Sequence, residues 1–177
     1  MEVANGDRSP TAWKNPTCIF SPTSANDVSL AVKILAFTGS KYAIRSGGHS
    51  PLEGWASIDN GVLILMSEMK DLSYNTADQT VRFGFGNLWG DVYHYTETLG
   101  RLPVGGRVGT VGPMLTPGGG LSHMSNRYGF SVDNVASFDV GTHSKLKYAM
   151  LIFPRLCLLM EASLLLAHPP SPISSGL

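Results

Sequence analysis

The sequence feature that most restricts the fold is the run Arg-Ser-Gly-Gly-His-Ser-Pro at residues 45–51, which directly follows the strand-like run 41–44. Glycines let a backbone come close to a ligand, and successive free N–H groups in such a turn form a concave anion site. Ser46 and Ser50 add hydroxyl donors, and His49 adds a side chain whose charge changes near neutral pH. The run suits a phosphorylated cofactor with a reactive ring nearby. A plain tight turn with an exposed histidine is the alternative.

The charge balance of the chain argues against a nucleic-acid-binding protein. Lysine and arginine together number 13, as do aspartate and glutamate, so the formal net charge is zero, whereas a nucleic-acid binder needs a basic surface. The two cysteines, Cys18 and Cys157, have no spacing typical of metal ligands, so no metal is expected. Residues 1–15 are polar, lack the apolar core of a signal peptide, and are expected to be a disordered lead.

The chain around the first glycine run is expected to form a strand–helix–strand unit. Residues 18–20 predict a short strand, and Ser24 with Asp27 three residues later is typical of a capping box that starts a helix. Apolar residues then recur at helical spacing until Gly39, which is suited to end the helix. A second strand over residues 42–44 leads into the glycines. This arrangement puts them at the carboxyl end of a strand, where open α/β units bind ligands.

Further along, the pattern predicts two more strands and a second helix. Residues 62–66 are a continuous apolar run typical of a buried strand, and residues 66–72 are expected to be a short connector with a turn of helix. A strand is expected over residues 80–85. Asn87 is suited to cap a helix that Gly100 ends. The expected apolar face of this helix comprises Leu88, Val92, Tyr95 and Leu99.

A second glycine-rich region is the other candidate site. It contains the run 105–112 and three consecutive glycines at 118–120, separated and followed by apolar residues. Linkers of low complexity rarely interleave glycine with valine and leucine, which favours backbone lying against a flat or charged ligand. A loosely ordered surface loop is the alternative. Asp133 and Asn134 follow, and an apolar strand is expected over residues 135–140.

Together these motifs resemble the flavin-binding domain of the vanillyl-alcohol oxidase / p-cresol methylhydroxylase (PCMH-type) superfamily, and within it the berberine-bridge-enzyme-like FAD-linked oxidases. The resemblance covers residues 16–140. It is carried by Pro22, the 45–51 run, Gly84 and Gly86 before Trp89-Gly90, the 105–112 run, Gly118 to Ser122, Tyr128-Gly129, and Asp133 to Val135. It implies an α+β fold with a small β-α-β subdomain and a second, glycine-rich α+β subdomain, truncated on the C-terminal side relative to the family.

The resemblance also implies a cofactor and roles for individual residues. FAD is the implied cofactor, with its flavin 8-methyl carbon bonded covalently to His49. Some relatives carry a second link through a cysteine where this chain has Val108, so only the His49 link is expected. The implied FAD-binding residues are Arg45, Ser46, Gly47, Gly48, His49, Ser50, Gly105, Gly106, Gly109, Thr110, Val111, Gly112, Gly118, Gly119, Gly120, Ser122, Asp133, Asn134 and Val135. No catalytic base is nominated, because in the family it usually lies in a separate substrate-binding domain.

The resemblance ends before residues 141–177, which are expected to be an unrelated apolar tail outside the fold. An alternative or artefactual terminus is one explanation for the abrupt change in composition. Residues 148–167 are long enough for a membrane span. Pro154, Arg155 and Glu161 argue against one, because a charge in the middle of a span costs about 3 kcal/mol.

The resulting functional hypothesis is the FAD-binding portion of an FAD-dependent oxidoreductase. In the family, a small-molecule substrate gives a hydride to the flavin, and dioxygen reoxidises the flavin. The alternative hypothesis is a truncated, catalytically inert fragment that binds FAD weakly or not at all. Family members are often secreted, but the sequence leaves the compartment, the substrate and the oligomeric state open.

Overall fold

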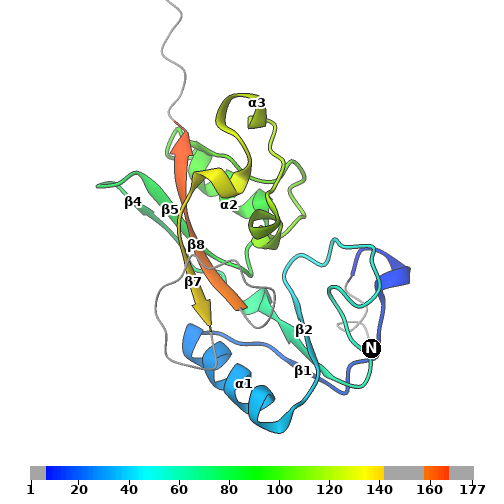
Figure 1. The fold of residues 1–177 in the computed structure, drawn as a ribbon. Coiled ribbons are helices and arrows are strands. Elements are labelled where there is room, and N and C mark those ends of the chain that lie inside the picture. The colour runs from blue at the N-terminus through cyan, green and yellow to red at the C-terminus, as the bar shows by residue number, and fades with distance from the viewer. Residues whose placement is uncertain (1–6, 142–157, 168–177) are drawn as a thin grey trace, which may run out of the picture.

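The computed structural model describes residues 7–141 and 158–167, which form two sheets accompanied by helices (Figure 1). The smaller sheet and α1 lie at one end of the molecule, and the larger sheet with α2 and α3 lies at the other. The expected α+β class is confirmed. The junction between the two parts is where the two glycine-rich runs lie.

The smaller sheet is three-stranded and entirely parallel, in the order β1 (Cys18–Phe20), β3 (Val62–Leu65), β2 (Tyr42–Arg45). Helix α1 (Ala25–Thr38) connects β1 to β2. The predicted strand–helix–strand unit is therefore confirmed. Since β2 ends at Arg45, the first glycine loop, residues 45–51, starts at the carboxyl edge of a parallel sheet, as expected.

The ends of α1 are set by local chemistry that the sequence already contains. The Ser24 hydroxyl accepts the Asp27 N–H at 3.2 Å, and the Asp27 carboxylate accepts the Ser24 N–H at 2.9 Å. This reciprocal pair satisfies N–H groups that have no partner inside the helix. At the other end Gly39 has φ 66°, a left-handed conformation that costs glycine little. Both predicted ends are confirmed.

The larger sheet is antiparallel, in the order β4-β5-β8-β6, with β7 also paired to β8. Its strands are β4 (Leu72–Asn75), β5 (Thr80–Gly84), β6 (Leu102–Pro103), β7 (Val135–Gly141) and β8 (Leu158–Ala167). The expected strands over 80–85 and 135–140 correspond to β5 and β7. Strand β4 was not predicted, because its sequence Leu-Ser-Tyr-Asn has no apolar run and only its pairing with β5 makes it a strand.

Strand β8 corrects the expectation that residues 141–177 lie outside the fold. It pairs with β5, β6 and β7, so it lies inside the larger sheet. An apolar segment of ten residues can form a strand between two others wherever its backbone N–H and C=O groups find hydrogen-bond partners. The change in composition before the segment does not prevent this pairing. Residues 142–157 and 168–177 lie outside the described part of the chain, and so does much of the possible membrane span. Among the residues described, no helix is long and apolar enough to cross a bilayer.

Helix α2 (Trp89–Glu97) differs from its prediction in both cap and face. Its first flanking residue is Leu88, whose N–H is accepted by the Asp91 carboxylate at 2.9 Å. The Asn87 amide instead donates to the carbonyls of Asp71 and Gly84, at 3.1 and 3.0 Å. The prediction of Asn87 as the cap was therefore wrong. The fully buried side chains of the helix are Trp89, Val92 and Thr96. Val92 agrees with the expected face, whereas Trp89 and Thr96 are buried in place of the expected Leu88 and Tyr95.

The remaining helical elements are short. The connector after β3 contains the expected turn of helix, η2 (Met66–Glu68). The segment after the second glycine run folds into η3 (Pro113–Gly118), α3 (Ser125–Tyr128) and η4 (Ser131–Asn134).

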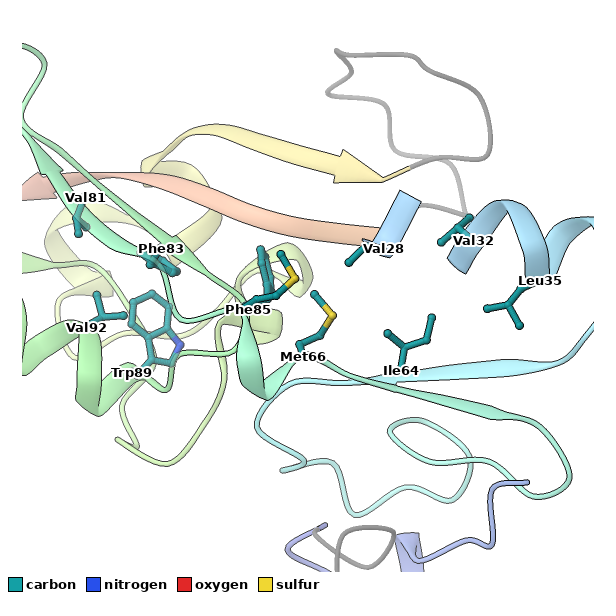
Figure 2. Packing of buried hydrophobic residues seen from close by; sticks show 11 residues of the cluster. Val28, Val32, Leu35, Ile64, Met66, Val81, Phe83, Phe85, Trp89 and Val92 are labelled. Atoms are coloured by element: carbon teal, nitrogen blue, oxygen red, sulfur yellow. The ribbon is translucent and has the colours of Figure 1, made fainter. Parts of the chain in front are cut away.

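One hydrophobic cluster connects the two parts of the fold (Figure 2). It extends from α1, through the end of β3, to β5 and α2, with Met66 and Phe85 between the two ends. Its fully buried side chains include Trp89, Phe83 and Ile64. Because both sheets share this cluster, the loops at their junction are held at a fixed separation.

Residues 7–15 correct the expectation of a disordered lead, because they pack on the fold. Asp7 and Ala12 are buried, and Asp7 forms an ion pair with the buried Arg45 at 3.2 Å. The Trp13 indole N–H donates to the Asp7 carbonyl at 2.9 Å, and Lys14 pairs with Glu53 and Asp59. The composition of the segment contains no indication of these contacts, since the ion pairs depend on partners more than 35 residues away.

Candidate functional site

The first glycine loop meets the second glycine loop, residues 105–112, in direct backbone contact. A Cβ atom at Gly47 would lie 2.3 Å from the Gly112 backbone nitrogen. A Cβ atom at Gly112 would lie 2.2 Å from the Ser46 Oγ atom and 2.5 Å from the Gly47 nitrogen. Distances below 3 Å leave no room for any side chain. Both positions therefore require glycine, and the two loops are in direct backbone contact at Gly47 and Gly112.

His49 lies across this junction and contacts both the second loop and the N-terminal segment. Its Nε2 atom is 2.8 Å from the Thr110 hydroxyl, and its Nδ1 atom is 3.4 Å from a guanidinium nitrogen of Arg8. Burial lowers the pKa of the His49 imidazole below its usual 6.5, and the positive charge of Arg8 lowers it further. The ring is therefore held neutral at physiological pH.

A cavity of about 750 Å³ opens at the same junction. Among the predicted site residues, Ser46, Gly47, His49 and Thr110 line it. Its other lining residues are Arg8, Ser67, Lys70, Gly86, Leu88 and Val108. The lining combines two cationic side chains, several hydroxyls and close-packed glycine backbone, which is a donor set suited to an anionic ligand.

The second glycine loop is held by the start of α2. The carbonyls of Val111 and Gly109 accept the N–H groups of Trp89 and Gly90, at 3.0 and 2.8 Å. Those N–H groups would otherwise have no partner at a helix end. The predicted site residues Val111 and Gly109 thus support the loop through their carbonyls, whereas Thr110 lines the cavity.

Gly105 and Gly106 lie against the ring of Trp89. Their Cβ atoms would come within 2.0 and 2.6 Å of ring carbons of that side chain, which is fully buried. The Tyr93 hydroxyl donates to the Gly106 carbonyl at 2.6 Å, and burial raises the pKa of Tyr93 to about 12. Packing against the Trp89 ring therefore explains why both positions are glycine, and neither residue lines the cavity.

The remaining predicted residues of the first loop support its shape. Arg45 is buried and pairs with Asp7. Gly48 has φ 61°, and its carbonyl accepts the Arg8 N–H at 2.9 Å. The Ser50 hydroxyl accepts the Leu52 N–H at 3.2 Å.

The three consecutive glycines belong to a second group of predicted residues, away from the cavity lining. The carbonyls of Gly119 and Gly120 accept the N–H groups of Val132 and Ser131, at 3.0 and 2.8 Å. Gly118 has open space around it, because a Cβ atom added there would meet no heavy atom of the described residues within 4 Å. The structure joins this run to η4, but none of its residues lines the cavity.

The predicted residues near η4 are also engaged in local hydrogen bonds. The Asp133 carboxylate accepts the Phe130 N–H at 2.7 Å, and the Asn134 amide donates to the carbonyls of Tyr128 and Phe130, both at 2.9 Å. The Ser122 hydroxyl accepts the Met124 N–H at 3.3 Å. Val135 begins β7. A role of this group in cofactor binding stays a prediction.

Sequence reasoning missed several cavity residues. Gly86 carries part of the resemblance, but the resemblance assigns it no role. A Cβ atom at Gly86 would lie 2.2 Å from the Met66 carbonyl oxygen, and only the structure shows this close approach. Lys70 and Ser67 lie in a connector with no motif. Arg8 lies in the segment whose composition predicts a disordered lead, where no local pattern marks it.

The buried pair of Asp7 and Arg45 leads to a stability prediction. Burial raises the pKa of Asp7, although the nearby Arg45 lowers it, so desolvation of the carboxylate outweighs its attraction to the guanidinium. We expect Asp7→Ala to lower the free energy of unfolding by about 2 kcal/mol, because a hydrogen bond to a charged group is lost. Asp7→Asn keeps an acceptor for Arg45 but leaves the buried guanidinium without a counter-charge, so it should also destabilise the fold, by less than Asp7→Ala. Urea unfolding of both variants measures this, and equal losses in the two would contradict it.

The parallel sheet, the two glycine loops and the shared cavity are features typical of proteins that bind a phosphorylated cofactor. Residues 16–144 match the family described as "FAD binding domain". The chain belongs to this family, and FAD is its cofactor. The resemblance to FAD-linked oxidases is confirmed, and a berberine-bridge-enzyme-like protein of Physcomitrella patens shares the fold.

Curated relatives agree with this membership. The bifunctional solanapyrone synthase of Alternaria solani is 52% identical over 139 residues, which cover 78% of this chain and 27% of that protein. An FAD-dependent monooxygenase of Arthrobotrys oligospora is 42% identical over 133 residues, covering 75% of this chain and 26% of that protein. The chain thus spans about a quarter of the length of these relatives.

Solved structures share the fold. The 6-hydroxy-D-nicotine oxidase of Arthrobacter nicotinovorans matches with a TM-score of 0.71 and 25% identity, over 84% of this chain and 36% of that one. The glucooligosaccharide oxidase of Acremonium strictum matches with a TM-score of 0.76 and 17% identity, over 93% and 38%. The latter is described with a 6-S-cysteinyl, 8α-N1-histidyl FAD. At that identity the likeness concerns the fold alone.

Proposed function

We propose that this chain is the FAD-binding portion of an FAD-dependent oxidoreductase, and that FAD is attached covalently through His49. One observation carries the proposal: His49 and the second glycine loop meet at a single cavity, through the contact of His49 with Thr110. The family supplies the cofactor. The resemblance nominates His49 as the residue that attaches it, and the contact with Thr110 at the cavity supports that choice.

The cavity lining fits the chemistry of FAD. The pyrophosphate is an anion, and Arg8 and Lys70 offer two cations, while Ser46 and Ser67 offer hydroxyl donors. Gly47 lines the cavity and has no side chain, so its backbone can come close to a bound ligand. A volume of about 750 Å³ lies within the usual range for cofactor pockets.

His49 has the properties that covalent attachment requires. Only a neutral imidazole has a nitrogen lone pair to donate, and the lowered pKa keeps the ring neutral. Attachment replaces one hydrogen of the flavin 8-methyl group and one of the imidazole by a C–N bond. The two electrons and two protons released go to the flavin ring and then to dioxygen. The histidyl FAD of the fold neighbour from Acremonium strictum supports this linkage.

The proposed reaction of the whole protein follows from the cofactor. Bound FAD would supply the redox chemistry, as an acceptor of a hydride from a small-molecule substrate that dioxygen would reoxidise. The names of the relatives and neighbours, a monooxygenase and several oxidases, support chemistry with dioxygen. This chain's own residues would bind the cofactor and hold its ring in place, whereas no residue here is nominated as the catalytic base.

Replacing His49 by alanine tests the attachment. The wild-type chain, purified after incubation with FAD, is expected to stay yellow after acid precipitation, because a covalent bond survives unfolding. His49→Ala is expected to give a colourless pellet, while His94→Ala, which alters an exposed histidine on α2, keeps the colour. Absorbance of the redissolved pellet is the measurement. A yellow pellet from folded His49→Ala would rule out the linkage.

The competing hypothesis is that the chain alone is inert and binds FAD weakly or not at all. It is favoured by the short span of the match, since the chain corresponds to 27% of its relative from Alternaria solani. Residues from the rest of such a protein can contribute to the cofactor site. Folded wild-type chain that stays colourless after reconstitution with FAD would support this hypothesis.

A further inference from the structure

We propose that Arg8, which lies upstream of the family-matched residues, is a positioning residue that fixes the orientation and tautomer of the His49 imidazole. This inference rests on the proposed role of His49. The family match begins at residue 16, so Arg8 belongs to a part of the chain to which the match assigns nothing. Together with Thr110, Arg8 contacts both nitrogens of the ring.

Asp7 and Arg8 attach the N-terminal segment to the first glycine loop through three contacts. The Asp7 carboxylate pairs with Arg45 at 3.2 Å, inside the protein. The Arg8 N–H donates to the Gly48 carbonyl at 2.9 Å, and the Arg8 guanidinium lies 3.4 Å from the His49 Nδ1 atom. Two of these contacts involve the loop backbone or a buried side chain. The backbone of Arg8 is therefore held beside His49 by these two contacts, so its position does not depend on the flexible side chain alone.

The donor and acceptor rules assign the tautomer. A guanidinium group only donates hydrogen bonds, so the Nδ1 atom of His49 accepts from Arg8 and carries a lone pair. A neutral imidazole has one N–H, which is then on Nε2 and donates to the Thr110 hydroxyl at 2.8 Å. Nδ1 is thus the atom available to bond the flavin, and Arg8 must move aside as that bond forms.

The charges around His49 also favour the neutral form of its imidazole. Arg8 and Lys70 are the charged residues of the cavity lining, and both are cations. The nearby Asp7 carboxylate is engaged with Arg45. Burial disfavours a protonated imidazole, and the positive charge of Arg8 disfavours it further, so the folded state binds the proton less readily than the unfolded state. Its titration midpoint lies below 6.5, and neutralising Arg8 raises that midpoint.

The experiment uses FAD-free chain labelled with ¹⁵N-histidine and long-range ¹H–¹⁵N NMR spectra recorded from acid to alkaline pH. His49→Ala identifies the His49 signals. Arg8→Leu removes both charge and donor, Arg8→Gln keeps a donor without charge, and Arg107→Gln removes a cation that does not line the cavity. Thermal unfolding of each variant confirms folding.

We expect wild type and Arg107→Gln to show the Nε2–H tautomer and a midpoint below 6.5. Arg8→Gln should keep the tautomer but raise the midpoint toward 6.5, and Arg8→Leu should also mix the tautomers. Covalent uptake of FAD by Arg8→Leu should be about tenfold slower than by wild type, as expected for a misplaced reacting group.

Unchanged tautomer and midpoint in both folded Arg8 variants would overturn the role of Arg8, even if wild type attaches FAD normally. Conversely, a wild-type chain that attaches no FAD would contradict the proposed function, while the NMR shifts would still support the contact. The two failures are therefore distinguishable.

Discussion

Replacing Gly47 by alanine is expected to weaken FAD binding by at least about a hundredfold, equivalent to about 2.8 kcal/mol. The same substitution should lower the free energy of unfolding by about 3 kcal/mol. The added Cβ would lie 2.3 Å from the Gly112 nitrogen and 3.1 Å from the Thr110 carbonyl oxygen. These are backbone atoms, so no side-chain rotation relieves the clash. The two glycine loops must separate, and the Thr110 contact of His49 is lost with them.

The effect of Gly47→Ala is measured by fluorescence titration with FAD and by urea unfolding. Gly109→Ala is the matched stability control, since its Cβ would meet Gly90 at an ordinary contact of 3.5 Å. The control should unfold within about 0.5 kcal/mol of wild type. Wild-type stability and FAD affinity in Gly47→Ala would contradict the loop contact on which the site depends.

Gly105→Ala is expected to destabilise the fold by about 3 kcal/mol or more, because its methyl group would overlap a fully buried ring. The Cβ atom would lie 2.0 Å from one Trp89 ring carbon and 2.2 Å from another. That ring is fully buried, and its centroid lies 5.6 Å from that of the Phe83 ring and 5.7 Å from that of the Tyr93 ring, so moving it would disturb both neighbours. Trp89 also starts α2, so its displacement would disturb the helix end that holds the second glycine loop.

Thermal and urea unfolding measure the effect of Gly105→Ala, and near-ultraviolet circular dichroism reports the environment of Trp89. Gly118→Ala is the control, because no heavy atom of the described residues lies within 4 Å of its Cβ position. It should unfold like wild type. If Gly105→Ala also unfolded like wild type, the close packing of this loop on Trp89 would be wrong.

Local signals in the sequence predicted local structure. The capping box of Ser24 and Asp27 and the left-handed Gly39 set the ends of α1, and each depends only on residues within one helix. Asn87 has the same chemistry as a cap, yet its amide bonds to two carbonyls outside α2. Which partner an amide finds depends on what the fold brings beside it, and the sequence alone does not contain that.

Non-local structure was beyond the sequence patterns. Strand β8 and strand β4 exist because other strands pair with them, and residues 7–15 are ordered by partners in the first glycine loop and beyond. The resemblance to a family provided the two glycine loops and FAD, but it covered only residues from 16 onward. Arg8 therefore had to come from the structure. Residues 118–122 show the opposite outcome. The resemblance assigned them to FAD binding, but none of them lines the cavity.

The most direct test is to map the flavin on the chain after incubation with FAD, by proteolysis and mass spectrometry. We predict one flavin-bearing peptide, which contains His49, and its loss in His49→Ala. A folded wild-type chain with no such peptide, or with the flavin on any other residue, would contradict the attachment of FAD through His49.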